Sequence, residues 1–210
     1  MKRDYTRAVL LMIKKLATVL IGLTLFFSPI FAQKTRFGLS LGLGTAIFTG
    51  PPGLIYEKEA FFTYCGGIWL DHALGEHFSI QSGLTYSKKG FDGSLSSFGL
   101  LTVITPVRLR IQYLEIPLVL KYYLTRKLYI GAGPYFAQKI SGQLTLFREE
   151  NDRLEPHEIG YTLGSGIVIN LFRKNHSLEL QWRRGVTPVF SIGDDKYIFT
   201  TLTILYGLYF

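Results

Sequence analysis

The sequence of 210 residues is poor in the features that usually stabilise a small domain. It contains a single cysteine, Cys65, which excludes an internal disulfide. After residue 33 it has no segment with the apolar period of an amphipathic helix. A helical bundle and a disulfide scaffold are therefore both excluded, and the fold has to be built from strands.

The longest apolar run lies near the N-terminus and is typical of a secretory signal peptide. Lys14 and Lys15 precede the largely apolar segment 16–27, and Ala32 is a small residue suited to cleavage. We expect residues 1–32 to be a signal peptide and residues 33–210 to form the mature domain. Met1 and Met12 are both candidate starts, and an uncleaved membrane anchor is the alternative. Since no cysteine follows the apolar run, we do not expect a lipoprotein.

Much of the excess positive charge belongs to this leader. Its removal takes away five of the 23 basic and one of the 15 acidic residues, which leaves a net charge of +4. The basic balance of the whole chain would suggest nucleic acid as a partner, but the mature domain keeps little of it. We therefore expect no nucleic-acid partner.

The mature sequence alternates apolar side chains with small or polar ones, which is the two-residue period of β-strands. In residues 37–47, for example, Phe37, Leu39 and Leu41 alternate with glycine and serine. Eight segments have this character: 37–47, 61–71, 77–88, 113–124, 127–138, 159–171, 177–185 and 196–210. The last is apolar on both registers over much of its length.

The connections between these segments alternate in length. Short connections lie at 73–76, 125–126 and 173–176, and longer ones at about 49–60, 89–112, 139–157 and 186–195. This alternation is typical of an up-and-down outer-membrane β-barrel, which has tight turns at one end and loops at the other. With eight strands, both ends of the domain fall at the short-turn end.

The composition of the two faces favours the same fold. The polar face consists mostly of Gly, Ser, Ala, Thr and Gln, which suits the side-chain-filled lumen of an eight-stranded barrel. Cys65 falls on this inward register and is expected to be a small buried residue. Trp69, Tyr113 and Tyr123 are large inward candidates. The alternative is a secreted barrel that binds a ligand inside, which would need its apolar face inward. The glycine-rich composition of the opposite face argues against this alternative.

Aromatic residues near the strand ends predict belts at the two membrane boundaries. They are Phe61, Phe62, Tyr64, Tyr86, Tyr122, Tyr123, Tyr129, Tyr135, Trp182, Tyr206 and Tyr209. The alternative is that these residues are ordinary strand and core formers.

The segments YLEIPLVLKYYL (113–124) and YIGAGPYFA (129–137), with the C-terminal LYF, resemble the outer membrane β-barrel domain family. That family includes PorT-like proteins and small OmpA-like eight-stranded barrels. The resemblance implies both chain ends in the periplasm and assembly by the outer-membrane insertion machinery. The machinery would recognise the terminal aromatic residue, here Phe210. Some PorT-like proteins are linked to protein secretion.

Four charged residues are predicted to form a polar network in the lumen. If the apolar face of 113–124 meets lipid, Glu115 and Lys121 point inward, where isolated charges are costly. Glu179 and Arg183 share the inward register of 177–185. We expect Glu115 with Arg183 in one layer and Lys121 with Glu179 in another. Pro117 lies between the layers and predicts a bulge or bend.

We find no set of residues suited to catalysis. No histidine can be placed beside the serines of residues 94–97, and the acidic segment around His157 has no fixed metal-ligand spacing. The apolar segment 91–106 would cover the barrel mouth, lengthen two strands or contact a partner.

We therefore expect an all-β, eight-stranded outer-membrane barrel that is not an enzyme and has no cofactor. Its role would be structural or one of interaction, with the outer loops as contact surface. Its expected partners are outer-membrane lipid, the insertion machinery and an envelope protein. An accessory role in a secretion or surface-assembly complex is the alternative function, and a barrel enzyme acting on lipid or peptide is less favoured.

Overall fold

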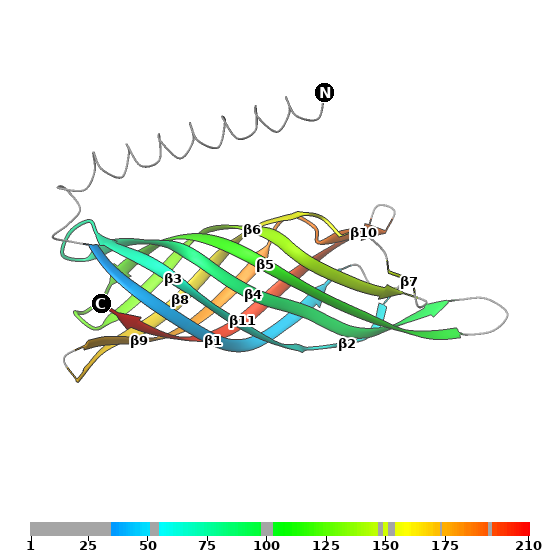
Figure 1. The fold of residues 1–210 in the computed structure, drawn as a ribbon, viewed down its shortest axis with the longest axis horizontal. Helices are drawn as coiled ribbons and strands as arrows, with labels where there is room; N and C mark the ends of the chain where they lie inside the picture. The colour runs from blue at the N-terminus through cyan, green and yellow to red at the C-terminus, as the bar shows by residue number, and fades with distance from the viewer. Residues whose placement is uncertain are drawn as a thin grey trace, which may run out of the picture. The chain divides into compact units, whose positions relative to one another are not determined.

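Figure 1 shows a computed structural model of the chain, which describes residues 35–50, 55–97, 103–146, 149–150, 154–172, 174–192 and 195–210. The predicted signal peptide, with both candidate starts, lies outside these residues. Within the described ranges, no helix is long and apolar enough to cross a membrane.

Eight long strands form a closed antiparallel barrel, as the sequence predicted. They are β1 (Thr35–Thr49), β3 (Phe61–Ala73), β4 (Phe78–Ser97), β5 (Val103–Tyr123), β6 (Leu128–Leu146), β8 (His157–Leu171), β9 (Lys174–Gly185) and β11 (Asp195–Tyr209). Each pairs with the next, and β1 pairs with β11 to close the barrel. Three short strands, β2 (Ile55–Glu59), β7 (Glu149–Glu150) and β10 (Phe190–Ile192), pair with β4, β6 and β11.

The two faces of the wall follow the two-residue period of the sequence. On β5, Ile116, Leu118 and Leu120 are exposed on the outer face, whereas Glu115 and Lys121 are buried inside. The same separation holds for β11, where Leu202, Ile204 and Tyr206 face outward. The outer surface is therefore a continuous apolar band, and the predicted register of β5 is confirmed.

The two ends of the barrel differ (Figure 1). One end, called here the turn end, carries the connections from β3 to β4, from β5 to β6 and from β8 to β9, together with the first residue of β1 and the last residue of β11. The opposite end, called here the loop end, carries the longer connections. The predicted alternation of connection lengths is confirmed except between β4 and β5, where most of the predicted connection 89–112 is strand; both ends of the barrel chain lie at the turn end.

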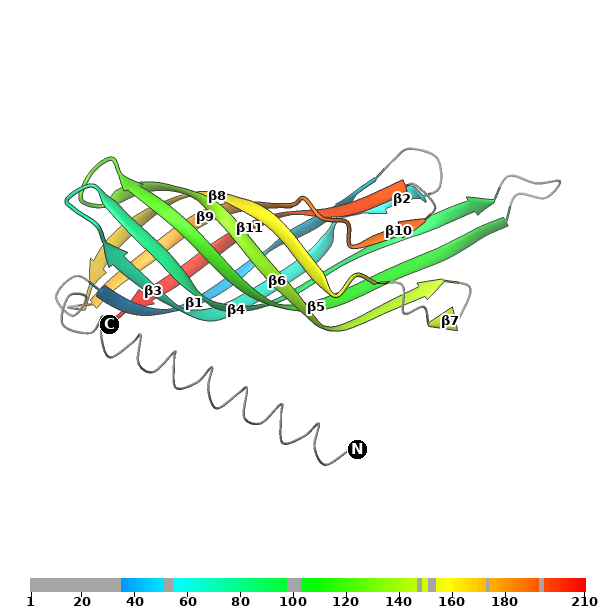
Figure 2. The same cartoon turned by 90° about the horizontal axis from the view of Figure 1, so that it is seen from above.

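The hairpin of β4 and β5 extends beyond the other strands at the loop end (Figure 2). The two strands have 20 and 21 residues, about twice the 9–11 that a membrane-spanning strand needs. They stay paired from Phe78 with Tyr122 up to Ser97 with Val103. Of the three expectations for segment 91–106, the lengthening of two strands is confirmed.

The bulge predicted at Pro117 is wrong. The register of β5 with β4 is the same on both sides of this residue, and Pro117 itself pairs with Tyr135 on β6. The irregularity lies instead between Gln112 and Tyr113, where β6 has Ile140 as an extra residue. A missing N–H removes one ladder bond, whereas a bulge needs an additional residue on one strand.

Candidate functional site

Seven charged side chains are buried inside the described part of the barrel. They are Asp71, Lys89, Glu115, Lys121, Glu158, Glu179 and Arg183. All lie on inward registers, because each strand sends every second side chain into the lumen. We refer to them as the lumenal network.

The part of this network nearer the loop end pairs two cations with two carboxylates. The Nη1 atom of Arg183 on β9 donates a hydrogen bond to Glu115 on β5. The Nζ atom of Lys89 on β4 lies 3.0 Å from Glu115 Oε1 and 2.8 Å from Glu158 Oε1. This loop-side layer therefore connects four strands, β4, β5, β8 and β9, across the lumen.

Neutral side chains add hydrogen bonds to the loop-side layer, in which Glu158 Oε2 alone has no hydrogen-bond partner among the described residues. Ser87 Oγ donates to Glu115 at 2.6 Å, and the Tyr135 hydroxyl donates to Glu158 at 2.5 Å. The Lys89 ammonium lies 5.0 Å from the ring centre of Tyr113 and 5.1 Å from that of Tyr135. Buried charges are tolerated when they are paired and hydrogen-bonded in this way.

A second layer lies nearer the turn end. Lys121 Nζ is 3.6 Å from Asp71 Oδ2 and 3.9 Å from Glu179 Oε2. Its ammonium also lies over the ring of Tyr129, 4.2 Å from the ring centre, and the Tyr129 hydroxyl donates to Glu179 at 2.8 Å. This turn-side layer holds one cation against two carboxylates.

Gln181 joins the two layers. Its Oε1 accepts a hydrogen bond of 2.6 Å from Arg183 Nε, and its Nε2 donates to Glu179 at 3.2 Å. Arg183, Gln181 and Glu179 are alternate residues of β9, so one strand face connects both ends of the network. The two predicted pairs, Glu115 with Arg183 and Lys121 with Glu179, are brought together within a single connected cluster.

Little space is left around these side chains. A cavity of about 40 Å³ lies between the layers, lined in part by Thr85, Lys121, Gln181 and Arg183. Since one buried water needs about 10–15 Å³ of such space, the cavity suits only a few waters. Among the described residues, no group of three or more His, Cys, Asp or Glu is placed to hold a metal ion.

An apolar plug closes the lumen above the loop-side layer. Its centre is Phe48 on β1, whose ring stacks on Phe91 at 4.1 Å and on Tyr197 at 5.2 Å between ring centres. Leu154 and Val189, from the connections before β8 and after β9, are buried in the same cluster. The loop-end connections thus contribute side chains that fill the mouth of the barrel.

Two network residues, Lys89 and Glu158, lie outside the segments that the sequence predicts to be strands. Lys89 continues the inward register of Thr85 and Ser87 along the lengthened β4, and this alternation was the available signal. Glu158 was assigned to an acidic loop with His157, but it is the second residue of β8 and points inward. The third network residue that the sequence analysis does not predict is Asp71. It lies within a predicted strand, and its alternation with Trp69 on β3 places it on the inward register.

The aromatic belts were predicted correctly only in part. Tyr64, Tyr122 and Tyr206 are exposed on the outer face, as a belt requires. Three others are buried in the lumen: Tyr129, Tyr135 and Tyr209.

Trp69, Tyr113 and Cys65 are buried inside as expected. Phe210 is 62% exposed, and its backbone N–H donates to the Phe37 carbonyl at 2.8 Å.

A closed barrel with an apolar outer band and a filled polar interior defines a small outer-membrane β-barrel protein. The family model for the outer membrane protein beta-barrel domain matches residues 31–191, and the chain belongs to this family. The protein is accordingly located in the cell outer membrane. No curated protein matches the chain.

Solved structures of other small barrels resemble this one in fold. Neisserial surface protein A has a TM-score of 0.51 and 8% sequence identity, over 83% of this chain and 97% of that chain. OprG from Pseudomonas aeruginosa has a TM-score of 0.48 and 14% identity, over 84% and 97%. Ail of Yersinia pestis has a TM-score of 0.47 and 10% identity, over 85% and 100%. At such identities the likeness concerns the fold alone.

Proposed function

We propose that this protein is a non-conducting barrel that acts through protein contacts at its loop end. The observation that carries the proposal is the contrast between the two parts of the molecule. The lumen is occupied by the lumenal network and the apolar plug, whereas the β4–β5 hairpin extends beyond the barrel (Figure 2). A filled lumen has no space for transport, so we place the function on the projecting hairpin.

Side-chain contacts between β3, β4 and β5 hold the base of the hairpin. Arg110 on β5 makes two hydrogen bonds to Asp92 on β4, of 2.9 and 2.7 Å. Its guanidinium lies over the ring of Phe61, 4.1 Å from the ring centre, and also donates to the Phe91 carbonyl. A preorganised surface loses less conformational entropy when it binds a partner. This preorganisation supports a role in recognition.

We further propose that the protein is not an enzyme, because its buried charged groups are engaged with one another. The resemblance to PorT-like proteins would make the partner a component of a secretion or surface-assembly complex. A role as a barrel enzyme acting on lipid or peptide would instead require turnover by the purified protein. Hydrolysis assays on purified barrel, with lipid and peptide esters, separate these two classes.

The proposal is tested by shortening the hairpin. Residues 94–106 are replaced by Asn-Gly, which joins the paired residues Gly93 and Val107 in a two-residue turn below the present tip. Tagged wild-type and shortened barrels are cross-linked in the native envelope, and bound proteins are identified after purification. We expect a partner that is lost from the shortened barrel while heat-modifiable migration on a gel stays normal.

A matched control changes the turn end instead, with Arg126→Gln and Lys127→Gln in the β5–β6 connection. This variant should retain the partner. Recovery of the same proteins with wild-type and shortened barrels would place the function elsewhere.

A further inference from the structure

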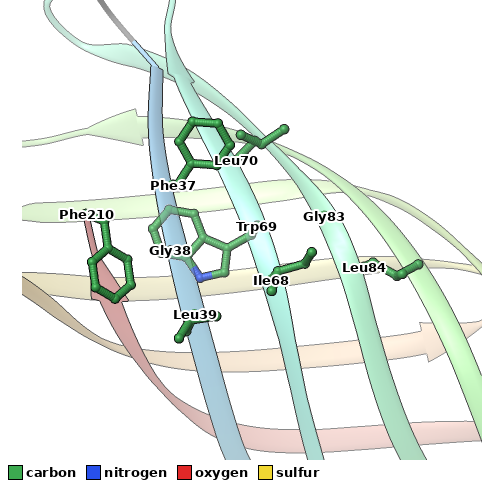
Figure 3. A pocket seen from close by; sticks show the side chains of 9 residues that line it. All are labelled: Phe37, Gly38, Leu39, Ile68, Trp69, Leu70, Gly83, Leu84 and Phe210. Atoms are coloured by element: carbon green, nitrogen blue, oxygen red, sulfur yellow. The ribbon is translucent and has the colours of Figure 1, made fainter. Parts of the chain in front are cut away.

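The outer face of the barrel contains an apolar groove at the turn end. Its volume is about 460 Å³, within the range of about 300–1,000 Å³ that is usual for small-molecule sites. Six outward side chains form its walls: Phe37, Leu39, Ile68, Leu70, Leu84 and Phe210. Figure 3 shows them around the strands β1, β3 and β4, with Phe210 from the end of the chain.

Backbone rather than side chains forms the floor of the groove. Gly38 on β1, Trp69 on β3 and Gly83 on β4 occupy inward-facing positions of their strands. Only their main-chain atoms therefore lie on the outer face. A Cβ atom at Gly38 would overlap the indole of Trp69, which lies behind β1 in Figure 3. Trp69 and Gly83 are paired neighbours on β3 and β4. The groove is therefore part of the wall itself, between two ridges of apolar side chains.

The location of the groove limits what can fill it. Its walls belong to the register that faces the hydrocarbon of the membrane. Lipid tails are as apolar as these side chains, so burial alone gives little selectivity between molecules in the bilayer. A stable occupant would be held by close packing in the groove and by a polar contact at its end.

Positive charge lies at the end of the groove. Lys174, the first residue of β9, places its Nζ atom 5.0 Å from the ring centre of the groove-lining Phe210. Lys174 has the outward register of β9, which it shares with the exposed Leu178 and Leu180. At the turn end as a whole, the described connections add Arg126 and Lys127 against a single acidic residue, Glu76. This arrangement is complementary to an anionic head group at the membrane surface.

We propose that the groove binds one acyl chain of an anionic phospholipid, whose phosphate contacts Lys174. The lipid belongs to the leaflet at the turn end of the barrel. Packing against the groove walls holds the chain, and Lys174 selects the charged head group. The proposal does not depend on the function of the hairpin at the opposite end.

Native mass spectrometry of the detergent-solubilised barrel tests this proposal. Phosphatidylglycerol and phosphatidylcholine with identical acyl chains are added separately, and bound lipids are counted per barrel. We expect one retained phosphatidylglycerol in the wild type and weaker retention of phosphatidylcholine. Lys174→Gln should weaken phosphatidylglycerol binding about fivefold, the change expected for one basic residue near an anionic lipid surface. Lys127→Gln, at the same end but in another connection, should leave retention unchanged.

A second pair of variants tests the groove itself. Leu39→Trp places a large side chain in the groove, whereas Leu43→Trp makes the same change on the same outer face of β1 beyond the groove. Heat-modifiable migration establishes that both variants are folded. Loss of the bound lipid from Leu39→Trp alone supports the proposal. Equal retention by the two variants, or a barrel dimer in place of the lipid adduct, overturns it.

Discussion

Arg183 on β9 donates a hydrogen bond to Glu115 on β5, although β6 and β8 separate these two strands in the wall. The contact crosses the lumen, where both side chains are buried. Lys89 lies on the other oxygen of the same carboxylate, at 3.0 Å. Glu115 is therefore the shared acceptor of two cations from opposite parts of the barrel, and its charge holds the loop-side layer together.

Reversal of this charge should destabilise the barrel strongly. Glu115→Arg places three cations together without a shared acceptor, and an uncompensated buried charge costs about 3–5 kcal/mol. Adding Arg183→Glu should recover part of the loss, but Lys89 would still face the new arginine. Thermal unfolding, followed by heat-modifiable gel migration, measures the three variants. A double variant no more stable than the sum of the single effects would show that the two residues are not coupled.

A glycine opposite an aromatic ring provides a second prediction. Tyr129 on β6 pairs with Gly166 on β8, and a Cβ atom at Gly166 would overlap the tyrosine ring. Gly166→Ala should therefore displace the ring, weaken its hydrogen bond to Glu179 and lower stability by about 1–3 kcal/mol. Gly75→Ala is the matched control, because a Cβ atom there meets no neighbouring atom within 4 Å. Thermal midpoints that are equal in the two variants would contradict this packing.

Phe210 should matter for assembly more than for the finished barrel. Its side chain is 62% exposed on the outer face, so its loss removes little packing. Deleting Phe210 should lower the amount of barrel in the outer membrane, whereas the purified variant should still fold into lipid vesicles. Quantitative blotting of membrane fractions measures the first effect, and gel migration after refolding measures the second. Wild-type amounts in the membrane would refute the predicted insertion signal.

Processing of the N-terminus can be measured directly. Because a basic segment, an apolar run and a small residue end at Ala32, the mature protein should begin at Gln33. N-terminal sequencing of the membrane-extracted protein identifies this residue. Retention of segment 16–27 would show that the leader is an uncleaved anchor.

The sequence was sufficient to predict the fold because alternation specifies the face of each strand. Once the apolar face of segment 114–124 is assigned to lipid, the alternation places Glu115 and Lys121 in the lumen, where both are buried. Pairing across the lumen was predictable because charged inward residues are few and each needs a partner.

Strand length and aromatic direction were harder to predict. The extension of β4 to Ser97 depends on pairing with β5, a tertiary effect that the local alternation through Lys89 indicates but does not establish. Lys89 was missed for this reason. Tyr129 and Tyr135 lie near the ends of the predicted segment 127–138, as belt residues would, but each ring fits over a glycine of β8 inside the lumen. Only the three-dimensional arrangement shows that space.

Planar-bilayer recording of the purified barrel examines the filled lumen itself. Among the described residues, the lumenal network and the apolar plug occupy the lumen, and the cavity between the two layers has a volume of about 40 Å³. We expect no stable conductance steps from the wild-type protein at a concentration at which a general porin in the same bilayer conducts. Reproducible, ion-sized steps from the pure barrel would contradict a closed lumen and, with it, a function confined to the surface.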